Sequence, residues 1–210
     1  PLSLPSLKPF LQASLTVIVP ILAILGASTH NSLILLLMVA LISLLTLLTI
    51  FLKRLIPSEL HSFVLLVISI SLLMHTALMS KYLNGWDLFL EYHVFRLANS
   101  NSLWSATLAY TNVKSLNYIL QSTGVKILNY DAMLSVTILP TIYSSLLNLQ
   151  GEWIFNVVYP LFYSLVPITL YQAYQQRFGR LAAFLSAFYF VAYPRFYQLE
   201  RREMIAEPFL

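Results

Sequence analysis

Residues 32–52 read SLILLLMVALISLLTLLTIFL, a stretch without a charged residue and with little except Leu, Ile, Val, Ser and Thr. A bilayer-spanning helix needs about 20 mostly apolar residues, so this stretch is long enough to cross a membrane as one helix. Residues 10–28 are also uncharged, and residues 60–79 contain His61 and His75 but no Lys, Arg, Asp or Glu. We therefore expect residues 1–80 to form three transmembrane helices.

The overall composition agrees with a membrane protein. Of the 210 residues, 59% are hydrophobic and only 10% are charged, whereas soluble domains carry about 25% charged residues. The mean hydropathy of +0.76 excludes a water-soluble enzyme and a disordered chain. The absence of Cys excludes disulfide frameworks, zinc ribbons and thiol catalysis. The net charge of +4 forms no basic run, so nucleic acid is not an expected partner.

Two further apolar runs follow a long, more polar segment. Residues 153–174 are rich in aromatic residues and contain Pro160 and Pro167, while residues 181–193 are short and end before Pro194. Proline is tolerated in membrane helices where neighbouring groups satisfy the freed carbonyls. We expect two transmembrane helices within residues 153–194. The chain begins at Pro1 and ends where a new apolar run starts, so we expect it to be the N-terminal piece of a longer protein.

The basic residues of the short loops predict the orientation. Cytoplasmic loops carry an excess of Lys and Arg, which places five residues in the cytoplasm: Lys8, Lys53, Arg54, Arg177 and Arg180. The N-terminus is then cytoplasmic, and residues 81–152 and 195–210 are extracytoplasmic. We expect an integral protein of the plasma membrane, with the lipid bilayer as its first partner.

Residues 131–149 are apolar enough to span the membrane, and such a span would reverse the membrane orientation of every later segment. Charge counting alone leaves both topologies open. The stretch contains Pro140 among several Ser and Thr residues, and the turn Gln150-Gly151-Glu152 after it has no basic residue. We therefore expect a re-entrant or interfacial helix on the outer face. The predicted fold is an all-α, multi-spanning transmembrane bundle with a long, partly helical first outer loop.

The first candidate site lies at the start of this outer loop, in residues 84–96, NGWDLFLEYHVFR. Asp87 and Glu91 share a helix face, and two like charges four residues apart cost a few tenths of a kcal/mol. A cation, a proton or a sugar hydroxyl between them would remove this cost. His93 and Arg96 lie on roughly the opposite face. In the alternative interpretation Asp87 is an N-cap and Glu91 is a solvated acid in the first turn.

The second candidate site is residues 195–207, RFYQLERREMIAE. Arginine suits a phosphate because its planar guanidinium donates two parallel hydrogen bonds. The alternative is a solvated helix start whose Arg and Glu side chains pair with one another.

These features resemble the N-terminal part of a GT-C type membrane glycosyltransferase. The resemblance lies in Gly85-Trp86-Asp87 after an outward-running span, in a proline-bearing segment of the outer loop, and in the basic turn 175–180. Residues 85–207 are more narrowly similar to an archaeal family of membrane proteins of unknown function. That family shows a G-x-D motif, an E-Y pair (Glu91-Tyr92) and a late R-x-x-A-E stretch, which corresponds here to residues 202–207 with one extra residue.

The resemblance implies transfer of a sugar from a polyprenyl-phosphate-linked donor to an acceptor on the extracytoplasmic face. Asp87 would be the general base, with Glu91 as its helper or, with Asp87, the ligand of a divalent cation such as Mg or Mn. The remaining candidates would bind substrate or phosphate: Arg201 or Arg202 as phosphate clamp, Tyr92 and His93 in the sugar pocket, and Arg96 and Glu203 nearby. We expect the 210 residues alone to be inactive.

Two other classes of function remain open. A transporter or flippase of a lipid-linked or small substrate would carry charges within its spans, or broken helices facing each other at the midplane. A non-catalytic membrane scaffold subunit would leave Asp87 and Arg201 exposed and far apart. The sugar, the acceptor and the oligomeric state are not readable from the sequence.

Overall fold

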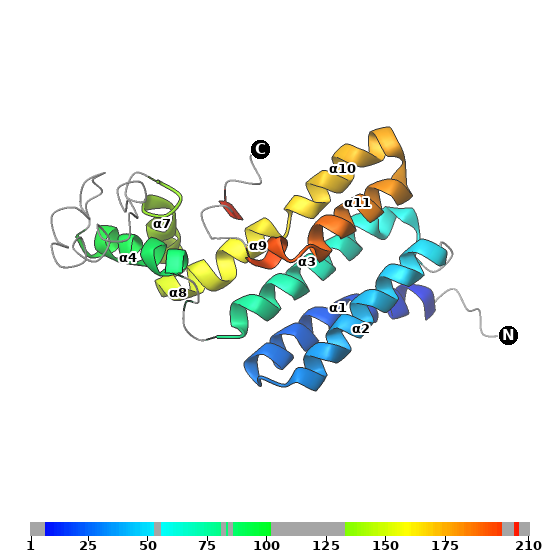
Figure 1. Ribbon diagram of the computed structural model, residues 1–210, viewed down its shortest axis with the longest axis horizontal. Coiled ribbons are helices and arrows are strands. Elements are labelled where there is room, and N and C mark those ends of the chain that lie inside the picture. The colour runs from blue at the N-terminus through cyan, green and yellow to red at the C-terminus, as the bar shows by residue number, and fades with distance from the viewer. Residues whose placement is uncertain are drawn as a thin grey trace. The chain divides into compact units, whose positions relative to one another are not determined.

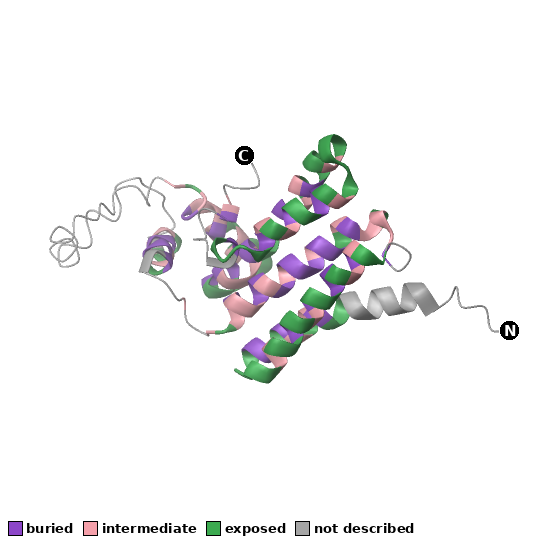
Figure 2. Ribbon diagram, turned by 45° about the vertical axis from the view of Figure 1, so that its right-hand side comes forward, coloured by how far each residue is buried: buried purple, intermediate pink, exposed green. Residues whose placement is uncertain are grey.

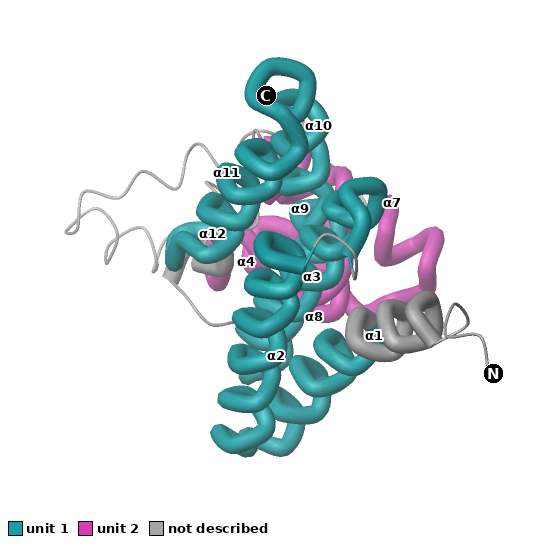
Figure 3. Tube along the Cα trace, turned by 90° about the vertical axis from the view of Figure 1, so that its right-hand side faces the viewer, with its two compact units in different colours: residues 1–81, 160–199 teal, residues 82–159, 200–210 magenta. Residues whose placement is uncertain are grey.

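The computed structural model describes residues 7–52, 56–80, 83, 86–101, 133–198 and 204–205, with 7–16, 86–87, 101 and 197–198 described by their backbone alone. Within this part of the chain every regular element is a helix, so the predicted all-α class is confirmed. The chain divides into two compact units (Figure 3). Unit 1 comprises residues 1–81 and 160–199, and unit 2 comprises residues 82–159 and 200–210.

Helix α3 is the centre of unit 1. It packs against five other helices (Figure 1): α1 (Leu7–Ser28), α2 (Ser32–Phe51), α10 (Val166–Phe178), α11 (Arg180–Ala192) and α12 (Arg195–Gln198). In the apolar run Ser58–Leu78, which contains α3 (His61–Leu78), 56% of the most apolar window is buried, against 28% in α2. Figure 2 shows this difference as buried residues along α3 and exposed ones along α2. Thus α3 is the core helix and α2 a peripheral one.

Hydroxyl groups inside unit 1 bond to their own helix. Ser69 and Ser71 of α3 are fully buried, and their Oγ atoms donate to the carbonyls of Leu65 and Val67 at 2.6 Å. A Ser or Thr side chain in a helix can reach the carbonyl four residues earlier in this way. The helix therefore satisfies these polar groups without water, as an apolar environment requires.

In the part of the chain that the structure describes, three helical runs are long and apolar enough to cross a membrane: Ser32–Phe51, Ser58–Leu78 and Gly151–Phe178. The large apolar side chains of α2 are exposed in many places, among them Leu33, Leu36 and Leu47. Such an exposed apolar surface is unusual for a soluble protein and suits contact with lipid. The first predicted span, residues 10–28, falls within the 22-residue helix α1. Its side chains are described only from Val17 onward.

The run Gly151–Phe178 is not one regular helix, as its two prolines demand. It consists of α8 (Gly151–Trp153), the π-helical segment η4 (Ile154–Val158), α9 (Tyr159–Tyr163) and α10. Proline has no N–H and its ring clashes with the carbonyl four residues earlier, so the wide π turn lies just before Pro160. A turn at residues 164–165 lies before Pro167, and there the Ser164 Oγ donates to the carbonyl of Leu161 at 2.6 Å.

Gly179 makes the turn between α10 and α11. Its φ of +81° lies in the region that side chains with a Cβ disfavour. Beyond it α11 has 13 residues, which at 1.5 Å per residue is about 20 Å and shorter than the roughly 30 Å hydrocarbon core. The fifth predicted span, residues 181–193, is therefore a helix but a short one. Arg180 at its start donates to Ser58 and, at 3.1 Å, to Glu59.

Unit 2 is built from α4 (Trp86–Asn101), α7 (Ile138–Leu147), α8 and η4, which contact one another. Its core is a cluster of buried apolar and aromatic side chains: Leu88, Phe95, Ile154, Phe155 and Tyr159. Asn148 ends α7 in the left-handed conformation, with φ of 50°, which Asn tolerates better than most residues. With ten residues, α7 falls short of a span. The interfacial or re-entrant placement predicted for residues 131–149 stays a prediction.

We expect Leu65→Ala in α3 to lower the free energy of unfolding by about 2–5 kcal/mol, because the substitution leaves a cavity beside the central helix. Leu65 is 0% exposed and Leu36 of α2 is 69% exposed. The matched substitution Leu36→Ala should change stability by about 0.5 kcal/mol or less. Thermal unfolding followed by circular dichroism in one detergent measures both, and equal losses would contradict the central position of α3.

Candidate functional site

Glu91 is fully buried, with 0% of its surface exposed. It is the sixth residue of α4 and shares a face with Leu88 and Phe95, three and four residues away, which belong to the core of unit 2. The solvated first-turn position considered from the sequence is therefore wrong. Desolvating a carboxylate costs free energy, which an apolar residue at this position would avoid, so the placement of Glu91 indicates a role beyond packing.

The surroundings of Glu91 include phenolic groups. Its carboxylate is close enough to the phenol group of Tyr159 for the two to interact electrostatically. The phenol group of Tyr143 also interacts electrostatically with that of Tyr159. The Tyr159 hydroxyl donates to the carbonyl of Ser135 at 2.5 Å. This bond joins Tyr159, the first residue of α9, to the segment before α7. Both residues belong to unit 2.

Asp87 is the second residue of α4, because the helix begins at Trp86. The N-cap role considered from the sequence is wrong for this reason. The backbone places Asp87 one turn before Glu91, and its side chain lies outside the described ones. Among the residues that the structure describes, no three His, Asp or Glu side chains group into a metal site. A divalent cation between Asp87 and Glu91 stays a prediction.

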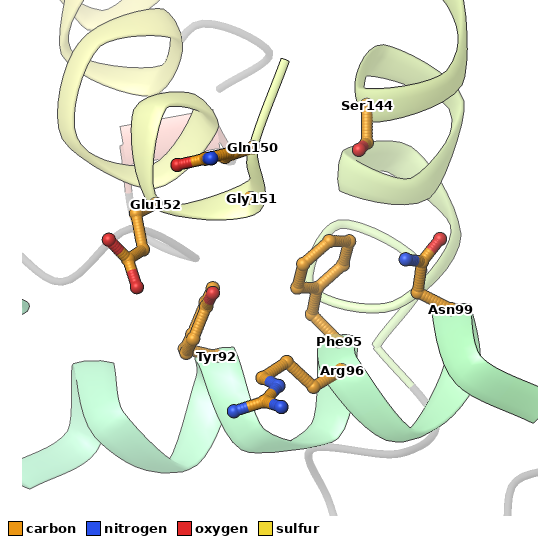
Figure 4. A pocket seen from close by; sticks show the side chains of 8 residues that line it. All are labelled: Tyr92, Phe95, Arg96, Asn99, Ser144, Gln150, Gly151 and Glu152. Carbon is orange, nitrogen blue, oxygen red and sulfur yellow. The ribbon is translucent and has the colours of Figure 1, made fainter. Parts of the chain in front are cut away.

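A pocket of about 430 Å³ opens beside α4, between this helix, α7 and the start of α8 (Figure 4). We call it the α4–α7–α8 pocket. Two aromatic side chains of α4 line it, Tyr92 and Phe95, and Figure 4 shows both rings extending from α4 toward the start of α8. The remaining lining residues are Gly151 and five polar ones: Arg96, Asn99, Ser144, Gln150 and Glu152.

The aromatic side of the pocket is held by ring packing. The centroids of Tyr92, Phe95 and Phe155 lie 5.7 Å from one another, and the Tyr92 and Phe155 rings are perpendicular at 88°. Edge-to-face pairs at such distances are favourable because the positive ring edge meets the negative face. Gly151 allows the close approach of α4 and α8, since a Cβ there would lie 2.2 Å from Cε1 of Phe95.

Burial raises the pKa of the Tyr92 phenol above its usual value of about 10. The carboxylate of Glu152 raises this pKa further, while the guanidinium of Arg96 lowers it by a smaller amount than burial raises it. Tyr92 is therefore neutral at physiological pH and can donate a hydrogen bond to a carboxylate or a ligand oxygen.

The structure describes three of the other predicted site residues, namely Tyr92, His93 and Arg96. Tyr92 and Arg96 line the pocket, but His93 does not, and its Nε2 atom is buried without a hydrogen-bond partner among the described residues. The role of His93 in a sugar pocket stays a prediction. Arg201, Arg202 and Glu203 lie outside the described residues. Ile205, near them in the sequence, packs against the core of unit 2.

Sequence reasoning missed five of the eight residues that line this pocket. Asn99, Ser144, Gln150, Gly151 and Glu152 were not candidates, although residues 150–152 form a polar turn between two apolar runs. The polarity of that turn was the available signal. Its partner on α4 could not be identified, because the contact joins residues far apart in the chain.

We expect Gly151→Ala to destabilise unit 2 by about 1–3 kcal/mol, the usual cost of an overpacked contact. The added methyl group would displace the ring of Phe95, which is 3% exposed. Phe95→Leu should recover part of this loss, so that the double variant loses less stability than the sum of the two single variants. A double-mutant cycle measures this difference as a coupling energy. Purely additive losses would show that the two residues do not touch.

We also expect Tyr92 to titrate above pH 10 in the folded protein, as measured by the phenolate absorbance of the wild type minus that of Tyr92→Phe. Glu152→Gln should lower this pKa, because it removes the nearby negative charge. Since the folded pKa exceeds the unfolded one, the stability linked to the Tyr92 proton is complete below about pH 10 and is lost as the pH rises toward the folded pKa. A Tyr92 midpoint at or below 10 would contradict the described environment.

No protein-family profile, no curated protein and no solved structure matches the chain.

Proposed function

We propose that the chain is the catalytic N-terminal part of an integral membrane glycosyltransferase. In this proposal it transfers a sugar from a polyprenyl-phosphate-linked donor to an acceptor on the extracytoplasmic face. The observation that carries the proposal is the buried carboxylate of Glu91 on α4, which follows the long apolar run that contains α3. Ionisable residues buried near membrane level are expensive and are functional more often than those of soluble proteins.

The architecture in this proposal is a multi-spanning bundle. The three long apolar runs and the exposed apolar surface of α2 support membrane association. The basic residues of the short loops, Arg177 and Arg180 among them, favour a cytoplasmic N-terminus in the plasma membrane. Residues 81–152 and 195–210 then lie on the extracytoplasmic face, where a lipid-linked donor can be reached from the outer leaflet.

The reaction needs a base and an anion clamp. The acceptor hydroxyl oxygen attacks the anomeric carbon of the donor sugar, the bond from that carbon to the phosphate oxygen breaks, and the lipid phosphate leaves with the electron pair. Asp87 takes the proton of the acceptor hydroxyl as general base. Glu91, one turn further along α4, helps Asp87 by orienting its carboxylate. Arg201 or Arg202 stabilises the negative charge of the leaving phosphate.

The packing of unit 2 supports a common position for these groups. Glu91 faces the cluster that contains Leu88 and Phe95, and Ile205 packs against the same cluster. Ile205, which follows the two arginines in the sequence, thus belongs to the same unit as Glu91. Fixed dipoles and charges are worth more in such a water-poor environment than in water.

A transporter of a lipid-linked sugar is the second candidate, and one observation favours it. The run Gly151–Phe178 is interrupted at residues 164–165, near its middle, and transporters often bind substrate at broken helices. The two prolines explain this interruption by themselves. The transferase remains the stronger proposal, because it gives the buried Glu91 a chemical task and agrees with the resemblance of residues 85–207.

We expect Asp87→Asn to abolish sugar transfer by the full-length protein, since the side-chain amide of Asn cannot take the proton from the hydroxyl of the acceptor substrate. Glu91→Gln should lower the rate by about 100-fold or more, within the range that a general base contributes. The matched control is Glu59→Gln, because Glu59 is exposed and its ion pair with Arg180 is a surface pair worth little. The assay follows label from polyprenyl-phosphate sugars into product, with and without Mg or Mn.

Unchanged turnover in Asp87→Asn would remove the assignment of the base. Label that crosses the membrane while still attached to its lipid would support the transporter in place of the transferase. Circular dichroism of each variant separates loss of activity from loss of folding. A rate that depends on the added metal in the wild type but not in Glu91→Gln would assign Glu91 as a metal ligand.

A further inference from the structure

We propose that the α4–α7–α8 pocket binds a neutral sugar unit of the acceptor, so that the acceptor of the reaction is a glycan. The inference rests on the proposed function for its place in the reaction, whereas binding itself is measurable without turnover. It is carried by the chemistry of the pocket lining, which combines an aromatic side with converging polar groups from three elements.

The aromatic side provides an apolar surface for one face of a sugar ring. Tyr92 is half-buried and supplies the accessible ring, whereas Phe95 is almost fully buried and supports it from behind. Both rings are held by Phe155 and by the backbone of Gly151. A sugar ring presents C–H groups on its faces, and these carry the partial positive charge that the negative face of an aromatic ring attracts. Because the rings are already packed in place, binding costs them little conformational entropy.

The polar side matches a ligand rich in hydroxyl groups. Asn99 and Gln150 are exposed, and each amide offers both donors and an acceptor. A sugar hydroxyl also donates and accepts at once, so it can pair with either end of an amide. The Ser144 Oγ donates to the carbonyl of Leu149 at 2.8 Å, which leaves its lone pairs to accept from a ligand.

The charges of the lining favour a neutral ligand over an ionic one. Arg96 and Glu152 are both exposed and both line the pocket, so their charges cancel within it. A phosphate is typically held by several basic groups, and a cation by several acidic ones. Arg96, which the resemblance places among the substrate- or phosphate-binding residues, is thus better placed here to donate to hydroxyl oxygens, with Glu152 accepting from a neighbouring hydroxyl.

The size of the pocket agrees with this ligand. Its volume of about 430 Å³ lies within the range of about 300–1,000 Å³ typical of small-molecule sites. The pocket is formed entirely by residues of unit 2, the unit that also contains Glu91. A glycan that is held in this pocket by one sugar unit can present a hydroxyl of a neighbouring unit to the donor sugar.

The test is saturation-transfer difference NMR on the purified full-length protein in detergent. The probes are the methyl glycosides of glucose, galactose, mannose and N-acetylglucosamine, with inorganic phosphate and choline as ionic probes. We expect saturable binding of at least one glycoside, with the strongest transfer to its ring C–H protons. Asn99→Ala and Gln150→Ala should each raise Kd by about 3- to 10-fold, the worth of one hydrogen bond. Gln176→Ala, an exposed Gln of α10, is the matched control and should leave Kd unchanged.

The pocket assignment is overturned by no glycoside binding, by binding of phosphate or choline alone, or by equal losses in Gln176→Ala. The two proposals can fail separately. Glycoside binding that depends on Gln150 without any sugar transfer supports the pocket and removes the transferase. Sugar transfer whose acceptor KM is unchanged in Asn99→Ala and Gln150→Ala supports the transferase and removes the pocket assignment.

Discussion

The buried hydroxyls of unit 1 donate to the carbonyl one turn earlier in the same helix, as Thr46, Thr49 and Ser69 do at 2.6–2.8 Å. An environment without water offers no other partner, and an unpaired polar group there costs free energy. The same constraint explains why the described elements are helices, because a helix satisfies its backbone groups within one segment. In the exposed turn before α2, Asn31 caps the amides of Leu33 and Ile34 and so satisfies the first donors of the helix.

The prolines of the fourth apolar run show how the chain meets this constraint where a regular helix is impossible. The π turn lies before Pro160 and the break at residues 164–165 lies before Pro167, with the Ser164 hydroxyl taking up one of the nearby carbonyls. The boundary between the two units falls between Tyr159 and Pro160. The boundary thus coincides with Pro160, whereas the break before Pro167 lies inside unit 1.

In unit 2 the same cost of buried polarity makes Glu91 informative. The contact of Phe95 with the backbone of Gly151 holds α4 against α8, and this packing places Glu91 inside and Tyr92 at the wall of a pocket. One helix thus presents a buried carboxylate next to an exposed pocket that holds an arginine and a carboxylate. Glu91 and the pocket thus belong to the same unit, with Glu91 buried in its interior and Tyr92, the next residue of α4, lining the pocket.

The sequence by itself determined the all-helical class and the long apolar helices predicted at residues 32–52 and 60–79, because these follow from local properties of the chain. The length of an apolar run acts without a partner. Only the tertiary structure decided that Glu91 is buried, that His93 is outside the pocket, and that Gln150 and Glu152 join Tyr92. Those results depend on which face of α4 meets α7 and α8, and that choice is made by the close approach of the Phe95 ring to Gly151, two residues far apart in the sequence.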